Sequence, residues 1–216
     1  MLNTELKLKV CGLTQISQAE ALTNENIDFL GFIFYNKSPR FVLHHLSADD
    51  IKGIKHPAKV GVFVNETTES IIQTADSAGL NLVQLHGDET LETVERLKNL
   101  SHNKFKIIKA FRISGTSLPV NLDEFENVAD YFLFDTDTKA FGGSGETFNW
   151  EILNQLNMNI PFFLSGGISS ENAAEINKLK KKPFALDINS KFEKSPGIKD
   201  FEKIKNFHSK IIKNEL

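Results

Sequence analysis

The chain has 216 residues, about 40% of them hydrophobic, and a formal net charge of −3. This size and apolar content predict one domain, residues 1–216, with a full core. The small charge excludes strong attraction to nucleic acid or to an anionic membrane. The single cysteine excludes an internal disulfide, and no apolar run is long enough to cross a bilayer. We therefore expect a cytoplasmic protein that is a monomer or a homodimer.

Eight short runs of apolar, β-branched or aromatic residues follow one another along the chain. Several are almost continuously hydrophobic, which is typical of strands in a parallel sheet that helices cover on both faces. The predicted strands are Leu6–Cys11, Phe29–Phe34, Lys59–Val64, Leu82–His86, Lys106–Phe111, Tyr131–Asp135, Phe162–Ser165 and Phe184–Ile188.

Amphipathic segments lie between these runs, and polar residues that can begin a helix precede them. Alternating strands and helices predict a parallel sheet. Because the repeats fill the chain and leave no linker, we expect a single-domain (β/α)8 TIM barrel of the α/β class, with eight parallel strands. A doubly wound open sheet is the alternative. The clearest predicted helices are Ser17–Thr23, Thr67–Ala78, Asp88–Leu100 and Ser169–Leu179, with Thr14, Thr67, Asp88 and Ser169 as their polar starts.

Polar or reactive residues end or follow every predicted strand. In such a barrel the catalytic groups gather at the C-terminal ends of the strands. A thiol, an imidazole, a carboxylate and a guanidinium at that edge can together carry out proton-transfer chemistry. The strand-end residues are Cys11, Tyr35, Asn65, His86, Arg112, Asp135, Ser165 and Asn189.

Glycine-bearing turns follow the sixth and seventh predicted strands, and a polar turn follows the eighth. Barrels often bind phosphate between the loops after the seventh and eighth strands. Glycines in such loops let backbone N–H groups approach an anion. A small phosphorylated substrate is therefore expected. The predicted phosphate-binding residues are Gly142, Gly143, Ser144, Gly145, Ser165, Gly166, Gly167, Asn189 and Ser190.

A metal site is not predicted. His44 and His45 are adjacent in the sequence, so their side chains diverge, and no third ligand has suitable spacing. A metal-dependent aldolase would need clustered histidine or acidic ligands, which the sequence lacks.

Several motifs in chain order resemble those of the phosphoribosylanthranilate isomerase family. The resemblance runs from about Leu6 to about Phe207. It implies a cofactor-independent Amadori rearrangement in tryptophan biosynthesis, from N-(5-phosphoribosyl)anthranilate to 1-(2-carboxyphenylamino)-1-deoxyribulose 5-phosphate. The motifs are Lys9–Thr14, Gly31–Phe34 with Lys37–Arg40, Val60–Asn65, Val83–Gly87, Phe134–Thr136 with Phe141–Gly145 and Phe148–Trp150, Leu164–Ile168 and Pro196–Asp200.

This reaction needs an acid and a base on opposite sides of the sugar. Opening the ribose ring needs a proton on the ring oxygen, a role for Asp135 if burial at the barrel mouth keeps its carboxyl neutral. Loss of the C2 proton needs a base, and Cys11 ends the first strand, well around the barrel. A free thiol is about 3% thiolate at pH 7, so polar surroundings would need to lower the pKa of Cys11 only modestly for it to act as the base.

Two further residues are expected to contact the substrate. The resemblance assigns Arg40 to the anthranilate carboxylate, which the planar guanidinium matches in a bidentate manner. His86 is expected to orient the substrate or to tune charge near the acid and the base.

One loop departs from the family pattern. Many members have a Ser-Ser-Gly turn before Val-Glu after the eighth strand, whereas this chain has Asn189, Ser190 and Lys191 before Phe192 and Glu193. Either the backbone accepts a residue other than glycine at position 191, or Lys191 changes the affinity for phosphate.

Two other functions remain open at this stage. The related histidine-pathway aldose isomerase performs the same rearrangement on a different aminoribosyl phosphate, with an aspartate at the position of Cys11. A non-catalytic barrel would bind a phosphorylated metabolite or a protein partner without turnover.

Overall fold

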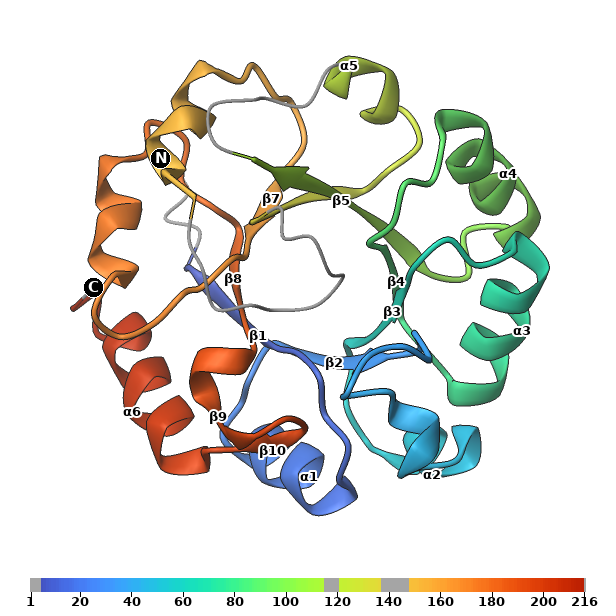
Figure 1. Cartoon of the computed structure of the whole chain (residues 1–216), viewed down its shortest axis with the longest axis horizontal. Coiled ribbons are helices and arrows are strands. Elements are labelled where there is room, and N and C mark those ends of the chain that lie inside the picture. Colours follow the sequence, from blue (N-terminus) through green and yellow to red (C-terminus); the bar gives the residue numbers. More distant parts are fainter. Residues whose placement is uncertain (1–4, 115–120, 137–147, 216) are drawn as a thin grey trace.

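Eight parallel strands close into a barrel, and helices surround it (Figure 1). The computed structural model describes residues 5–114, 121–136 and 148–215. The barrel closes because β1 pairs with β8 as well as with β2, with Lys9 opposite Asp187. The predicted (β/α)8 barrel is therefore confirmed, and the open sheet is excluded. The strands are β1 (Lys7–Val10), β2 (Phe29–Ile33), β3 (Lys59–Phe63), β4 (Leu82–Leu85), β5 (Lys106–Ile113), β6 (Tyr131–Thr136), β7 (Phe162–Leu164) and β8 (Ala185–Ile188).

The helices after β5, β6 and β7 are short, whereas α6, which follows β8, has 12 residues. A small antiparallel pair, β9 (Glu193–Ser195) with β10 (Ile198–Lys199), follows β8. The α-helices are α1 (Ile16–Asn24), α2 (Ala48–Gly53), α3 (Thr68–Ala78), α4 (Leu91–Ser101), α5 (Leu122–Phe125) and α6 (Phe201–Ile212). The 3₁₀ helices are η1 (Val42–His44), η2 (Trp150–Gln155), η3 (Ala173–Lys178) and η4 (Ser190–Phe192).

One predicted helix start is confirmed and two are corrected by the structure. Helix α3 begins as predicted, with the Thr67 hydroxyl accepting from the Ser70 N–H. Helix α4 begins later than predicted, at Leu91, because Thr90 is its cap, while Asp88 pairs with Arg112. Helix α1 begins at Ile16, one residue earlier than predicted. Gln15 is at its N-cap position without a side-chain cap bond, and the Thr14 hydroxyl donates instead to the Gly197 carbonyl.

The predicted helix Ser169–Leu179 is replaced by the six residues of η3. The bonds at its predicted start are those of a capped helix. Asn172 Oδ1 accepts from the Ser169 N–H at 2.8 Å, and Asn172 Nδ2 donates to the Gly167 carbonyl at 3.0 Å. A side chain that bonds back to the N–H three residues earlier is half of a capping box, so Ser169 begins the segment as predicted, but tighter 3₁₀ turns follow it.

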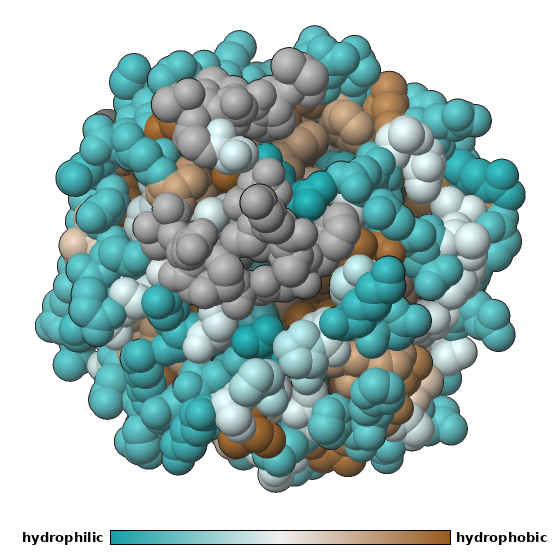
Figure 2. Space-filling model, in the orientation of Figure 1, coloured by the Kyte–Doolittle hydropathy of each residue, from teal (hydrophilic) through white to brown (hydrophobic). Residues whose placement is uncertain are grey.

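Alternate strand residues face the helices or the barrel interior. Outward residues such as Leu8, Val10 and Phe32 belong to the large cluster between strands and helices. Hydrophilic side chains make up most of the perimeter in Figure 2, as expected for the outer faces of these helices. A second apolar cluster fills the interior and comprises Phe29, Val60, Leu82, Ile108, Ala110, Leu133, Phe163 and Ala185.

Three polar side chains interrupt this apolar interior. Lys9, Gln84 and Asp187 are at most 6% exposed, and each lies two positions before a strand-end residue, namely Cys11, His86 or Asn189. Their side chains contact one another although β1 and β4 are not neighbours in the barrel. They therefore lie inside the barrel, directly beneath its C-terminal mouth. No helix among the described residues is long and apolar enough to cross a membrane.

Candidate active site

Cys11 lies at the C-terminal end of β1, inside the mouth of the barrel. Its N–H donates to the Ile188 carbonyl at 2.9 Å, and its side chain packs with Ile33 and Val62. Gly31 on the neighbouring strand makes room for it, because a Cβ at position 31 would lie 2.9 Å from the Cys11 sulfur. The glycine in the middle of β2 thus positions the thiol.

Burial raises the pKa of the Cys11 thiol. The charges of Lys9 and Lys199 oppose this effect, and the charge of Asp187 adds to it. The shift is therefore opposite to the modest lowering of the pKa that the base role was said to need. The sequence shows the polar residues near the strand end, but it does not show that the sulfur is removed from water. Loss of water disfavours the charged thiolate.

Lys9 connects Cys11 to the rest of the site. Its ammonium donates to Gln84 Oε1 and to Asp187 Oδ2, both at 2.8 Å, and its charge interacts electrostatically with the Cys11 thiol. Burial acts to lower the pKa of Lys9, but the interactions with Asp187 and Cys11 together outweigh it, and the pKa is raised. Lys9 therefore stays charged beside the thiol.

Asp135 lies on β6, and its side chain is 17% exposed. Its Oδ2 is 3.1 Å from His86 Nε2, and its Oδ1 accepts from the Thr136 N–H at 2.8 Å. Gly166 packs against this group, since a Cβ there would lie 3.2 Å from Asp135 Oδ1. The carboxyl is thus held in place from β4, β6 and the turn after β7.

His86 joins the two sides of the mouth. Its Nδ1 is 2.7 Å from Gln84 Nε2, and its Nε2 faces Asp135. A continuous line of contacts therefore runs from Lys9 through Gln84 and His86 to Asp135, and the charge of Lys9 acts on Cys11. The structure brings the predicted base, the predicted acid and the predicted histidine together at one end of the barrel.

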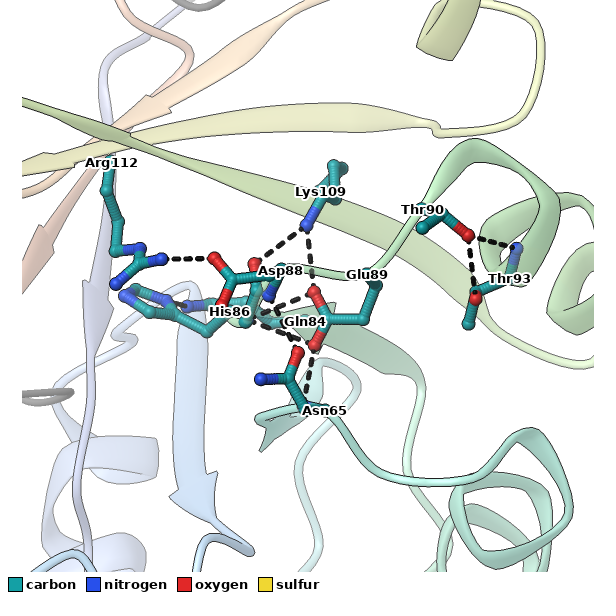
Figure 3. A network of polar contacts seen from close by, with 10 residues as sticks. Asn65, Gln84, His86, Asp88, Glu89, Thr90, Thr93, Lys109 and Arg112 are labelled. Carbon is teal, nitrogen blue, oxygen red and sulfur yellow. Dashed lines mark hydrogen bonds and ion pairs between the residues drawn. The ribbon is translucent and has the colours of Figure 1, made fainter.

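A buried ion pair fixes the turn that follows His86 (Figure 3). Glu89 Oε2 accepts from Lys109 Nζ at 2.8 Å, and Glu89 Oε1 accepts from the N–H groups of Asn65 and Gly87. Both charged side chains are at most 5% exposed. Sequence reasoning gave them no role, although a lysine inside an apolar strand is a signal that could have identified Lys109.

Arg40 contacts a carboxylate of the protein itself. Its Nε and Nη2 donate to Glu193, with Nη2 2.8 Å from Oε2, and Glu193 also accepts from Lys199 Nζ. Burial acts to raise the pKa of Glu193, but the Arg40 hydrogen bond and the Lys199 charge outweigh it, and the pKa is lowered. Three buried charges, two positive and one negative, thus lie at the mouth near Cys11.

The predicted phosphate-binding residues are only partly described. Ser165, Gly166 and Gly167 form the turn after β7, and both glycines have positive φ, +87° and +65°. Asn189 and Ser190 follow β8, on the neighbouring strand. These two turns lie side by side, as the prediction requires. The remaining predicted residues, Gly142, Gly143, Ser144 and Gly145, lie outside the described part of the chain.

Lys191 lies in the 3₁₀ helix η4 and is exposed. Its φ is not positive, so the backbone accepts a residue other than glycine at this position. The first of the two explanations offered for the departure from the family pattern is therefore supported.

Arg112, Asn65 and Tyr35, which also follow or end strands, are not part of the line of contacts from Lys9 to Asp135. Arg112 pairs with Asp88, and Asn65 Oδ1 accepts from the Asp88 N–H at 2.7 Å. Tyr35 packs against the cluster around Cys11. Within the described ranges, no group of three or more His, Cys, Asp or Glu side chains could hold a metal ion. His44 is exposed, and its ring packs on Phe41.

Comparisons with known proteins agree with this geometry. Residues 8–210 match the family model described as N-(5'phosphoribosyl)anthranilate (PRA) isomerase. The N-(5'-phosphoribosyl)anthranilate isomerase of Parabacteroides distasonis is 41% identical over 209 residues, which cover 95% of this chain and 93% of that protein.

Two solved structures share the fold. The crystal structure of phosphoribosyl anthranilate isomerase from Thermotoga maritima has a TM-score of 0.78 and 34% identity, covering 97% of this chain and 99% of the other. A structure of the isomerase in complex with reduced 1-(o-carboxyphenylamino)-1-deoxyribulose 5-phosphate has a TM-score of 0.73 and 31% identity, with the same coverage. This chain therefore belongs to the phosphoribosylanthranilate isomerase family.

Proposed function

We propose that Cys11 and Asp135 perform the isomerase reaction of the family in this chain, as general base and general acid, with no metal or cofactor. The reaction is an intramolecular oxidation–reduction that converts an aminoaldose phosphate, N-(5-phosphoribosyl)anthranilate, into the corresponding aminoketose phosphate. The observation that carries the proposal is the position of the two groups. A thiol that follows β1 and a carboxyl on β6 lie at the same mouth. A line of polar contacts leads from Lys9, whose charge acts on the thiol, to the carboxyl.

The first step opens the ribose ring. Asp135 gives a proton to the ring oxygen, the C1–O electron pair goes to that oxygen, and the nitrogen lone pair forms a C1=N bond. A neutral carboxyl suits this step, and its two oxygens are held by His86 and the Thr136 N–H. Because the carboxyl is already held in one orientation, little entropy is lost in positioning it for each turnover.

The second step moves a proton from C2. The Cys11 thiolate takes this proton, the C2–H electron pair forms a C1=C2 bond, and the C1=N pair returns to nitrogen. The enol hydroxyl then loses its proton while C1 gains one. C2 is thereby oxidised to a ketone and C1 is reduced, so no outside oxidant is needed. Exchange with water returns Cys11 and Asp135 to their starting states.

The ends of the substrate have separate sites in this proposal. The phosphate lies against the turns after β7 and β8, where Ser165, Gly166 and Gly167 face Asn189 and Ser190. The anthranilate carboxylate binds Arg40. Arg40 and Lys199 carry two positive charges against the single negative charge of Glu193, so this corner favours a second carboxylate.

Loss of fluorescence from freshly made phosphoribosylanthranilate tests the proposal. We expect turnover by the wild type and none above background for Cys11→Ala and Asp135→Asn. Turnover of only the histidine-pathway substrate would favour that isomerase instead, and tight binding without turnover would favour a non-catalytic barrel. The family's biosynthetic role and the single cysteine support a cytoplasmic location. A monomer or a homodimer stays a prediction, which the molecular mass in solution decides.

A further inference from the structure

The contacts of Lys9 fix the orientation of the Gln84 amide. An ammonium group has three N–H donors and no acceptor, so the Gln84 atom that it contacts at 2.8 Å must be the amide oxygen. The other end of the same amide is then the NH₂ group. It lies 2.7 Å from His86 Nδ1.

The Gln84 amide in turn fixes the proton on His86. An NH₂ group can only donate, so Nδ1 must be the acceptor and carries no proton. The imidazole proton is then on Nε2, which lies 3.1 Å from Asp135 Oδ2. A protonated, positively charged imidazole would place an N–H at Nδ1 against the NH₂ group, so this arrangement disfavours the imidazolium.

We propose that Gln84 is a positioning residue that holds His86 as the neutral imidazole with its proton on Nε2, so that His86 donates to Asp135 and orients its carboxyl toward the substrate. This inference rests on the proposed role of Asp135 as the acid. Gln84 contacts no reacting atom and acts through His86, while Lys9 holds the Gln84 amide oxygen.

The position of Gln84 supports a role beyond packing. Its side chain is 1% exposed and lies on the inward face of β4, where the preceding inward residue, Leu82, belongs to the apolar interior. Burying the Gln84 amide and the Lys9–Asp187 ion pair costs free energy. Apolar residues of similar size at these positions would not carry that cost. The amide is bonded at both ends, to Lys9 and to His86.

The groups that face His86 explain why the control of its proton matters. Asp135 on β6 is its direct partner, and Asp187 on β8 is close enough to interact with it by charge. These two carboxyls attract a second proton to the imidazole. The amide of Gln84, held by Lys9, opposes that protonation at Nδ1.

Nitrogen NMR of histidine-labelled protein tests this directly, with the His86 signals assigned from their absence in His86→Asn. In the wild type at neutral pH we expect the shifts of a neutral ring protonated at Nε2. In Gln84→Glu the carboxylate accepts from Lys9 and has no proton to donate, so we expect a proton at Nδ1. Gln73→Glu, on the exposed face of α3, makes the same charge change and should leave both signals unchanged.

Steady-state kinetics supply the second readout. Gln84→Glu should lower kcat about tenfold or more, within the range of a lost acid–base contribution, and leave KM nearly unchanged. Gln84→Met removes the amide without adding charge. It should lower kcat too, with a mixture of His86 tautomers.

The outcomes separate this inference from the proposed function. A wild-type ring that is charged, or protonated at Nδ1, would overturn it without any variant. Inactive Asp135→Asn together with fully active Gln84→Glu would overturn the inference and leave the proposed function standing. Active Asp135→Asn would remove the proposed acid and this inference with it.

Discussion

The guanidinium of Arg40 donates to the carboxylate of Glu193, with Nη2 2.8 Å from Oε2, and both side chains are at most 7% exposed. The residue expected to hold the substrate carboxylate is therefore itself held by a carboxylate. This pairing fixes the plane of the guanidinium before the substrate binds.

Arg40→Ala should raise KM about 10- to 100-fold, because a hydrogen bond to a charged group contributes about 1.5–3 kcal/mol. The value of kcat should change less, since Arg40 contacts no reacting atom in the proposal. Arg96, an exposed arginine paired with Glu69, gives the matched control Arg96→Ala. An unchanged KM in Arg40→Ala would remove Arg40 from the substrate site.

Glu193→Gln should destabilise the fold by about 3 kcal/mol at neutral pH, because it leaves Arg40 and Lys199 without a buried counter-charge. The pKa of Glu193 is lowered in the folded state. Its charge therefore stabilises the fold above the ordinary glutamate pKa of about 4.3, and this contribution is lost as pH falls through the lower folded value.

Denaturant unfolding of the wild type and Glu193→Gln across this pH range checks the prediction. The difference between them should be largest at neutral pH and should shrink in acid. Glu69→Gln, in an exposed pair, should have a small effect at every pH. If the difference in unfolding free energy between the wild type and Glu193→Gln did not change with pH, the charge of Glu193 would not be what stabilises the fold.

The pH profile of kcat/KM should rise toward alkaline pH. A base works when it has lost its proton, and burial raises the pKa of Cys11, so its thiolate form accumulates above the ordinary thiol pKa of about 8.5. Cys11→Asp places a carboxylate at the same position and should move the rising limb to lower pH. If the limb stays where it is in Cys11→Asp, another group is the base.

Gly31→Ala should lower kcat about 100-fold, because its Cβ would lie 2.9 Å from the Cys11 sulfur and from the Cys11 Cα, and a displacement of about 1 Å can have this effect. Gly53→Ala is the control, since nothing lies within 4 Å of a Cβ there. Equal kcat in the two variants would contradict the close fit at Cys11.

The barrel was predictable because its eight strands are buried on both faces. Runs such as Phe29–Ile33 are then apolar throughout, and their order along the chain is their order in the barrel. The helix after β7 was predicted at the right start but in the wrong form, because the choice between α and 3₁₀ turns depends on packing against the rest of the fold. The rise in the pKa of Cys11 was not predicted for a similar reason, since burial cannot be read from neighbours in sequence.

The strand-end site was predicted, but the residues beneath it were not. Lys9, Gln84 and Asp187 carry a visible signal, since each is a polar residue two positions before a strand-end residue in an apolar strand. The sequence does not show that they touch, because β1 and β4 meet only across the barrel interior. The partner of Arg40 was also hidden, since Glu193 is 153 positions away in the chain.

Release of deuterium from C2 of labelled phosphoribosylanthranilate tests most directly whether Cys11 is the base. In single-turnover experiments, the wild type should release the label with a primary isotope effect, and Cys11→Ala should release none above background while still binding the product. Release by Cys11→Ala at the wild-type rate would contradict the account, because some other group would then remove the proton.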